Sequence, residues 1–254
     1  MLRRTLITAG VTIAGLAGLA WWQRNPIARW ALTQRDNKDL VLTNANKDAN
    51  ICLLTPQQIE GPFFVPAPTR RDIREDRRGL HLQLSLQIVQ ANGCTPITDA
   101  VVEIWHCDAA GRYSAYPENL SRSPVETLRF LGGPGGHVKP VNEKRYLRGA
   151  QATNQRGIAT FETILPGWYE PRVPHIHAKV FRQGRSYLTT QLYFPSELTR
   201  AIYAQHPDYA PHGACPYTHQ NDAVLGNYPQ AQTLLLNPLA QAEKLSADCV
   251  LAIA

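Results

Sequence analysis

The sequence predicts an all-β fold, an antiparallel β-sandwich with long loops that follows an N-terminal signal or anchor segment. Apolar and polar side chains alternate strictly over residues 80–88, which is typical of a strand with one buried face. The chain contains 19 prolines and 17 glycines in 254 residues, and this composition indicates many turns. No long helical pattern separates the predicted strands, which argues against a parallel α/β sheet.

The predicted strands follow one another between turn signals. Asn92-Gly93 supplies a turn soon after the first strand. Glycine, proline or asparagine separates the later strands, which are predicted at residues 101–105, 158–164, 176–181, 187–194 and 249–253. The longest loop runs from residue 114 to about residue 148. A loop of this length can belong to an active site or be a surface insertion, and the sequence leaves both open.

Three regions are predicted along the chain: an export signal or membrane anchor at residues 1–22, a linker at 23–50 and the β-sandwich domain at 51–254. Arg3 and Arg4 precede an uncharged run at residues 5–22, as in a signal peptide, and the adjacent pair fits a twin-arginine export signal. The run is also about long enough to span a bilayer. We expect an exported protein, periplasmic or extracellular, which stays attached to the membrane through residues 5–22 if the segment is not cleaved.

Charge and cysteine content limit the partners and the compartment. The net charge is +6, and residues 1–50 hold seven basic against three acidic residues, so the remaining chain is only mildly basic and we expect no nucleic-acid binding. An oxidising compartment allows at most two disulfides among the five cysteines. Cys94 and Cys107 flank a short strand–turn segment and could bridge, whereas burial of most cysteines as small apolar side chains is equally compatible.

The densest chemical motif is PGWYEPRVPHIH at residues 166–177. In a strand, His175 and His177 project from the same side, and two imidazoles held in this way form half of a metal site. The turn before them can bring Tyr169 and Arg172 toward the same point. Taken alone, a histidine pair of this kind is also compatible with an ordinary polar face.

Three other motifs precede this one in the chain: EGPFF at residues 60–64, VEIWHCDAAGRYS at 102–114 and LRGAQAT at 147–153. In this order the four motifs resemble the intradiol ring-cleavage dioxygenases, the family of the catechol and protocatechuate dioxygenases. The resemblance covers residues 55–222 and is strongest to the exported single-domain members.

The resemblance implies a non-haem Fe(III) ion bound by Tyr113, Tyr169, His175 and His177. Phenolates are hard anionic donors that suit a ferric ion. The implied reaction cleaves a catechol-type ring with O2 between its two hydroxylated carbons and yields a muconate-type diacid that contains both oxygen atoms. By the same resemblance, Tyr169 is the ligand that the catechol displaces.

The resemblance also implies roles beside the metal. Arg172 stabilises charge on the activated ring, as a permanently cationic guanidinium can, and Gln191 lines the oxygen and substrate side of the pocket. Tyr116 and Tyr146 are rival phenolates, whereas His106 does not match a ligand position. The sequence leaves two further questions open. Three aromatic residues could line the substrate pocket or pack in a core: Phe63, Phe64 and Trp168. Three residues of a loop-like segment could reach the site or lie away from it: His212, His219 and Asp222.

Two other classes of function compete with this interpretation. A non-catalytic β-sandwich binding module could retain the fold, although it would not need all of the tyrosines, histidines and arginine. A zinc hydrolase could use His175 and His177, but the sequence offers no obvious third ligand or general base such as an HExxH helix. Neither the particular catechol nor the oligomeric state can be predicted.

Overall fold

The computed structural model describes residues 45–46, 51–116, 137–227, 233–241 and 244–254. The predicted signal or anchor segment, most of the predicted linker and residues 117–136 of the long loop lie outside these ranges. The described residues belong to one compact unit, Leu42–Ala254. Within them, no helix is long and apolar enough to cross a membrane.

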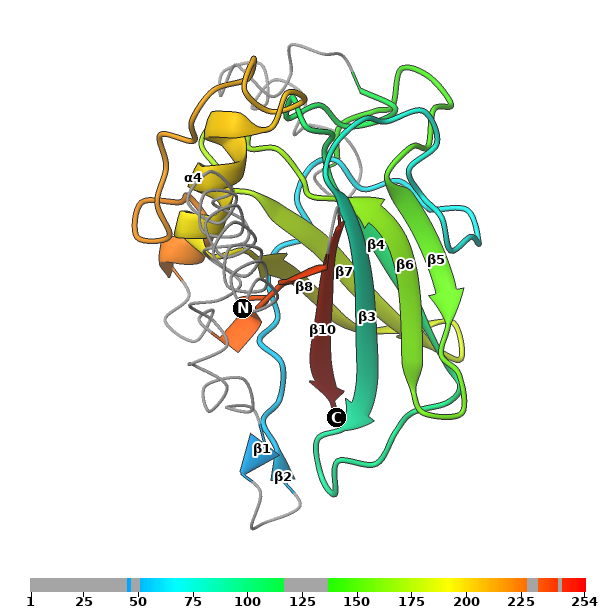
Figure 1. Cartoon of the computed structure of the whole chain (residues 1–254). Coiled ribbons are helices and arrows are strands. Elements are labelled where there is room, and N and C mark those ends of the chain that lie inside the picture. Colours follow the sequence, from blue (N-terminus) through cyan, green and yellow to red (C-terminus); the bar gives the residue numbers. More distant parts are fainter. Residues whose placement is uncertain (1–44, 47–50, 117–136, 228–232, 242–243) are drawn as a thin grey trace, which may run out of the picture. The chain divides into compact units, whose positions relative to one another are not determined.

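The described part of the chain forms two four-stranded sheets (Figure 1), which confirms the predicted all-β sandwich. The first sheet has the order β6-β3-β10-β9, with β6 at Ile158–Ile164, β3 at His81–Gln90, β10 at Lys244–Ile253 and β9 at Leu239–Gln241. The second sheet has the order β5-β4-β7-β8, with β5 at Arg148–Ala152, β4 at Ala100–Trp105, β7 at His175–Arg182 and β8 at Arg185–Tyr193. A separate two-stranded pair joins β1 at Ala45–Asn46 to β2 at Ile51–Cys52.

The alternation that predicted β3 also builds the core. Leu82, Leu84, Leu86 and Ile88 are fully buried, while the side chains between His81 and Gln87 on the other face are partly exposed. Each such aliphatic side chain contributes roughly 1.5–3 kcal/mol when it leaves water. The second sheet supplies a matching apolar face, whose fully buried members are Val102, Ile104, Ile176, Ala178, Val180 and Leu192.

One strand pair departs from the antiparallel arrangement that the sequence predicted. Strand β10 runs parallel to β3, from Lys244 opposite His81 to Ile253 opposite Gln90. Figure 1 shows these two strands side by side in the nearer sheet, with β7 and β8 behind them. A parallel pair needs a long crossover, and the chain between β3 and β10 supplies one by passing through the second sheet.

Helix α4 (Ser196–Gln205) and strand β5 were not predicted. The helix has ten residues and buries only one side, through Leu198, Thr199, Ile202 and Tyr203, so its apolar period is too short to stand out. Strand β5 reads RGAQA and lacks the β-branched or aromatic residues that mark a strand. Its pairing with β4 and its burial hold it in the sheet.

The disulfide joins Cys52 to Cys94, so the possible bridge between Cys94 and Cys107 does not form. Cys94 lies in the turn before β4, whereas Cys107 lies just beyond the other end of β4. Six strand residues span roughly 20 Å, and a disulfide requires Cα atoms about 4.4–6.8 Å apart. Cys107 is a free, buried thiol whose Sγ lies 3.4 Å from the carbonyl oxygen of Gly167.

Candidate metal centre

Strand β7 carries the candidate site on the face that points away from the apolar core. Ile176 and Ala178 belong to the core face, and strand alternation therefore turns His175 and His177 to the opposite face. Both histidines are nevertheless buried, because other segments cover this side of the sheet. One of them brings Gly61 against His177, where a Cβ on the glycine would lie 3.2 Å from Cε1 of the imidazole.

The register of the sheet lines up the neighbours of these histidines. His177 lies opposite Trp105 of β4 and Gln191 of β8, and His175 lies opposite Tyr193. Directly opposite residues in antiparallel strands share a face of the sheet, so all of these side chains are directed to the same region. The Trp105 and His177 rings stack with centroids 4.8 Å apart and planes inclined by 5°.

The structure brings together all four side chains that the resemblance identifies as ligands. The Nε2 atoms of His175 and His177 are 3.2 Å apart, and the Tyr169 hydroxyl lies 3.3 Å from Nε2 of His175. The Tyr113 ring lies 5.5 Å from the Tyr169 ring and 6.3 Å from the His177 ring, between centroids. Two phenol oxygens and two imidazole nitrogens thus converge on a small buried volume.

The protonation of these groups fits a bound cation. Nδ1 of His175 lies 2.7 Å from the carbonyl oxygen of Val173 and donates to it, so Nε2 carries a lone pair. Burial lowers the pKa of both His175 and His177 well below the usual range, which keeps the rings neutral. Burial also raises the pKa of the Tyr113 and Tyr169 hydroxyls, so ionisation of either needs a positive charge beside it. The Tyr113 hydroxyl is buried with no hydrogen-bond partner among the described residues, as expected for a donor that a metal would engage.

Arg172 lies beside the four side chains within a buried network. Its Nη2 donates to Oε1 of Gln191 at 2.5 Å, and its Nη1 lies 3.5 Å from Nε2 of His175. Its Nε lies 3.0 Å from each carboxylate oxygen of Asp222. The neighbouring charges of Tyr169 and Asp222 more than offset burial and raise the pKa of Arg172, so this guanidinium stays cationic. The loop aspartate, whose position could not be predicted, therefore reaches the site.

The other candidate side chains have different partners. The Tyr116 hydroxyl donates to the carbonyl oxygen of Phe64 at 3.1 Å. The Tyr146 ring packs with Leu147 and Ile164 under the guanidinium of Arg77, in a separate cluster. His106 bonds to the Cys107 carbonyl and the Thr163 hydroxyl, in agreement with the expectation that it is not a ligand.

The aromatic residues divide between the site and the loops around it. Phe63 is buried and stacks on Tyr113, with centroids 4.7 Å apart and planes inclined by 28°. Phe64 meets the Trp105 ring edge-on at 5.0 Å. Trp168 instead packs on His212 outside the ligand set, with centroids 4.5 Å apart. Phe63 thus orients a candidate ligand, whereas Trp168 fixes a loop.

Sequence reasoning missed a polar contact beside the EGPFF segment. One Glu60 oxygen pairs with Nζ of Lys179, and the other lies 2.7 Å from Nε2 of His137. Val138 also donates its backbone N–H to the Pro62 carbonyl at 2.9 Å. These contacts hold residues 60–64 against β7. No sequence signal connects them, because the partners are separated by 77 and 119 residues.

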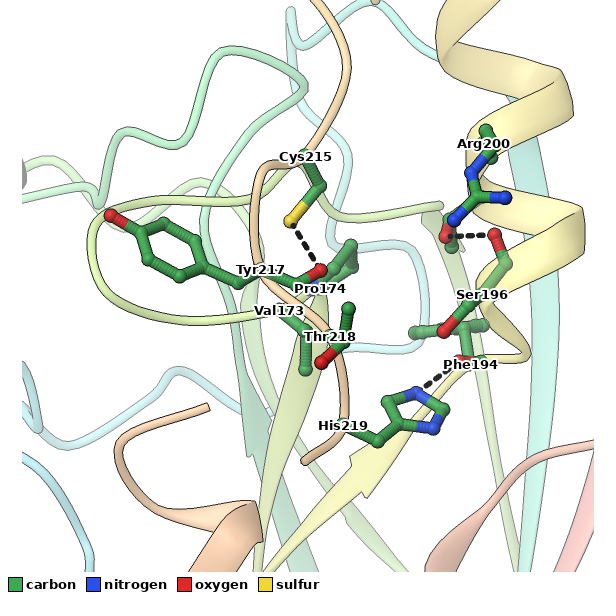
Figure 2. Close-up of a pocket in the computed structure, with 10 residues that line it drawn as sticks. Val173, Pro174, Phe194, Ser196, Arg200, Cys215, Tyr217, Thr218 and His219 are labelled. Atoms are coloured by element: carbon green, nitrogen blue, oxygen red, sulfur yellow. Dashed lines mark hydrogen bonds between the residues drawn. The ribbon is translucent and has the colours of Figure 1, made fainter. Parts of the chain in front are cut away.

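A small pocket lies beside the ligand-bearing turn, and none of the four candidate ligands lines it. Figure 2 shows Val173 and Pro174 among the lining residues, together with Cys215 and His219. Nε2 of His219 lies 3.0 Å from the carbonyl oxygen of Phe194, so the histidine joins its loop to the end of β8. His219 therefore does not reach the candidate metal site.

Comparison with known proteins identifies the family to which the chain is similar. A family model described as dioxygenase matches residues 59–203. A catechol 1,2-dioxygenase from a Pseudomonas species is 30% identical over 165 residues, which cover 61% of this chain and 51% of the relative. A chlorocatechol 1,2-dioxygenase from Rhodococcus opacus is 27% identical over 169 residues, which cover 56% of this chain and 57% of the relative. The chain thus spans about half the length of the curated relatives it matches.

Solved structures extend the similarity over more of the chain. An intradiol ring-cleavage dioxygenase from Tetranychus urticae superposes with a TM-score of 0.69 at 32% identity, over 80% of this chain and 94% of that chain. The dioxygenase domain of a dioxygenase–carbohydrate-binding fusion from a Streptomyces species gives a TM-score of 0.53 at 28% identity, over 80% of this chain and all of that domain (100%).

Proposed function

Because the chain belongs to the intradiol ring-cleavage dioxygenase family, we propose that it is a non-haem Fe(III)-dependent intradiol dioxygenase. Its substrates are a catechol-type aromatic compound and O2, and its product is a muconate-type diacid. The observation that carries the proposal is the buried convergence of Tyr113, Tyr169, His175 and His177.

Two tyrosines and two histidines would hold the ferric ion: Tyr113, Tyr169, His175 and His177. Phenolate oxygen and neutral imidazole nitrogen are suitable donors for this ion, and two phenolates offset most of its charge. When bound, the ion acidifies coordinated hydroxyl groups and activates the chelated catechol toward O2. A zinc hydrolase is disfavoured by the same donor set, because zinc sites rarely use tyrosine and are built from cysteine, histidine and carboxylates.

Tyr169 is suited to move a proton as the catechol binds. The family resemblance implies that Tyr169 would be a displaceable ligand, and a phenolate oxygen at this position could accept a proton from a catechol. In the structure its hydroxyl is hydrogen-bonded to Nε2 of His175 at 3.3 Å, within the group of candidate ligands. Burial raises its pKa, which would favour the protonated form of this phenol whenever it is not coordinated.

Arg172 is the group that stabilises negative charge on the substrate ring. Its guanidinium is buried and cationic, and its Nη1 faces the histidine pair. A fixed cation in a site that excludes water stabilises developing charge more strongly than it would in solvent. Gln191 accepts from Nη2 of Arg172 and donates from Nε2 to the Ile59 carbonyl at 3.0 Å, so it links the arginine to the covering segment.

We also infer that the protein works in an oxidising compartment outside the cytoplasm. The Cys52–Cys94 disulfide supports this location, since such bonds persist mainly in exported proteins. The basic and apolar composition of residues 1–22 is consistent with export. Release or membrane attachment depends on whether that segment is cleaved.

Oxygen uptake by purified, iron-loaded protein tests the proposed function. Catechol, a substituted catechol, hydroxyquinol and protocatechuate are each supplied, and O2 consumption is measured together with the ultraviolet absorption of the product. We expect one O2 consumed per ring opened, with at least one member of the panel. A non-catalytic binding module would bind the catechols with no O2 consumption, and that result would exclude the proposed activity.

A further inference from the structure

Asp222 is a fully buried carboxylate in the loop between α4 and the short helical turn η4 (Leu225–Asn227). Its side chain is 0% exposed, although the loop on either side of it reaches the surface. A carboxylate in such a place is costly unless donors surround it. The donors that surround Asp222 come from its own loop and from the turn that carries Arg172.

The two oxygens of Asp222 accept hydrogen bonds from two directions. From its own loop, the backbone N–H groups of Val224 and Leu225 donate to Oδ1 at 2.9 and 2.7 Å. From the ligand-bearing turn, the backbone N–H of Val173 donates to Oδ2 at 2.7 Å, and Nε of Arg172 lies 3.0 Å from both oxygens. Every one of these partners is a donor, so only a carboxylate satisfies them all.

These contacts determine which edge of the Arg172 guanidinium faces the site. Asp222 occupies Nε, and Gln191 occupies Nη2. The remaining nitrogen, Nη1, is directed to Nε2 of His175 at 3.5 Å. A rotation of the guanidinium would break the bond to Asp222, because Nε has a single hydrogen.

The loop that carries Asp222 is attached to the same turn at a second point. Nε1 of Trp168 donates to the Gly213 carbonyl at 3.0 Å, and Nε2 of His212 lies 2.8 Å from the Trp168 carbonyl. Residues 212–222 thus hold the turn 168–172 from outside. Ala223 also donates its backbone N–H to the Pro171 carbonyl at 3.4 Å. Of these attachments between described residues, only that of Asp222 involves the arginine side chain.

We propose that Asp222 is a positioning residue for catalysis, which holds the Arg172 guanidinium with Nη1 toward His175 and the other candidate ligands. The inference rests on the proposed dioxygenase function. Asp222 touches neither substrate nor metal and acts only through Arg172.

Two substitutions separate this role from support of the loop. Asp222→Ser keeps a hydroxyl acceptor that can cap the N–H groups of Val224 and Leu225, but it lacks the charge and reach to hold Arg172. Asp222→Asn keeps the side-chain volume, but its NH2 group must face one of the N–H donors that the carboxylate now accepts from, such as Val173 N–H. Asn221→Ala is the matched control, because the exposed Asn221 side chain bonds, among the residues that the structure describes, only to Thr218 of the same loop.

The test combines kinetics with a direct view of the guanidinium. For both Asp222 variants we expect a kcat lower by about 10- to 100-fold and a KM within about threefold of wild type, with iron content unchanged. In protein loaded with diamagnetic Ga(III), the Nε–H NMR signal of Arg172, assigned by its loss in Arg172→Ala, should exchange slowly with solvent. That protection should disappear in Asp222→Ser and persist in Asn221→Ala.

The following results would overturn the proposed positioning role of Asp222. An iron-loaded Asp222→Ser enzyme with wild-type kcat, or an equal kcat loss in Asn221→Ala, would overturn the proposal. If neither Asp222 variant folds, a rapidly exchanging Arg172 Nε–H in the wild-type protein still overturns it. Absence of O2 consumption by the wild-type enzyme would be a different result, namely failure of the proposed function.

Discussion

Nε2 of His175 and Nε2 of His177 lie 3.2 Å apart on the outer face of strand β7. The alternation of the strand places the two rings on one side, and burial keeps both of them neutral. Nε2 of His175 has no proton, because Nδ1 donates to the Val173 carbonyl. With two tyrosine hydroxyls beside them, the rings form a donor set that is best satisfied by a cation.

Arg172→Ala should separate metal binding from catalysis. Because the arginine is not among the four candidate ligands, the variant should retain iron and its visible absorption. Loss of the fixed cation should lower kcat by about 10²- to 10³-fold, as when one stabilising donor is removed from an active site. Iron analysis and O2 uptake on the same sample check this prediction. Loss of iron from the variant would contradict the role assigned to Arg172.

Gly61→Ala should weaken metal binding through His177. Gly61 has a φ of +77°, and an added Cβ would lie 3.2 Å from Cε1 of that ring. The ring cannot easily retreat because it stacks on Trp105. We expect metal affinity to fall about tenfold, as for other changes that displace a ligand.

Gly184→Ala is the control for this substitution. Gly184 has a similar φ of +74°, but no atom of the described residues lies within 4 Å of its added Cβ, so it carries the backbone cost without the contact. Competition with a chelator measures both affinities. An equal loss in the two variants would show that the contact with His177 is unimportant.

His106 should make the fold less stable in acid. Its complete burial lowers its pKa from 6.5 to about 4, so between these values the unfolded chain binds a proton that the folded chain does not. The stabilisation from neutral His106 is present above about pH 6.5 and is lost as the pH falls toward 4. The loss of unfolding free energy amounts to about 2–3 kcal/mol at pH 4.5, relative to pH 7.

Urea unfolding of metal-free protein at pH 7 and pH 4.5 measures this effect without interference from metal loss. The free energy of unfolding should fall by about 2 kcal/mol less in His106→Gln than in the wild type over this interval. Equal decreases in the two proteins would mean that His106 does not titrate differently in the folded and unfolded states.

The Cys52–Cys94 disulfide should contribute measurably to stability. It closes a segment with a sequence separation of 42 residues, for which loop-closure entropy predicts up to about 4 kcal/mol. The double variant Cys52→Ser/Cys94→Ser should lose about 2–4 kcal/mol in urea unfolding and become insensitive to reductant. Cys215→Ser removes a free thiol and should leave stability unchanged. A wild-type unfolding curve unaffected by reductant would refute the prediction.

The features that the sequence predicts well are those encoded locally. The alternation at residues 80–88 became β3, and the spacing of His175 and His177 placed both rings on one face of β7. The two tyrosines that the family resemblance implied as ligands lie beside those rings, in separate turns. In each case a short motif carries both the side chain and the backbone shape that directs it.

The features that sequence reasoning missed depend on segments far apart in the chain. Asp222 lies 50 residues after Arg172 in a loop without periodicity, so nothing local indicated that it contacts the arginine. The disulfide partner of Cys94 could not be predicted for the same reason, since only the three-dimensional path of the chain brings Cys52 to it. Strand β5 depends on its neighbour β4 rather than on its own composition.

The visible absorption of the iron-loaded protein is the most direct test of the central claim, which is that Tyr113 and Tyr169 bind a ferric ion with His175 and His177. We predict a red-brown protein with a tyrosinate-to-Fe(III) charge-transfer band that shifts when catechol is added. Tyr113→Phe should weaken this band, whereas Tyr116→Phe, at the neighbouring tyrosine bonded to the Phe64 carbonyl, should leave it unchanged. A colourless protein with full zinc occupancy, or a band that survives Tyr113→Phe intact, would contradict the claim.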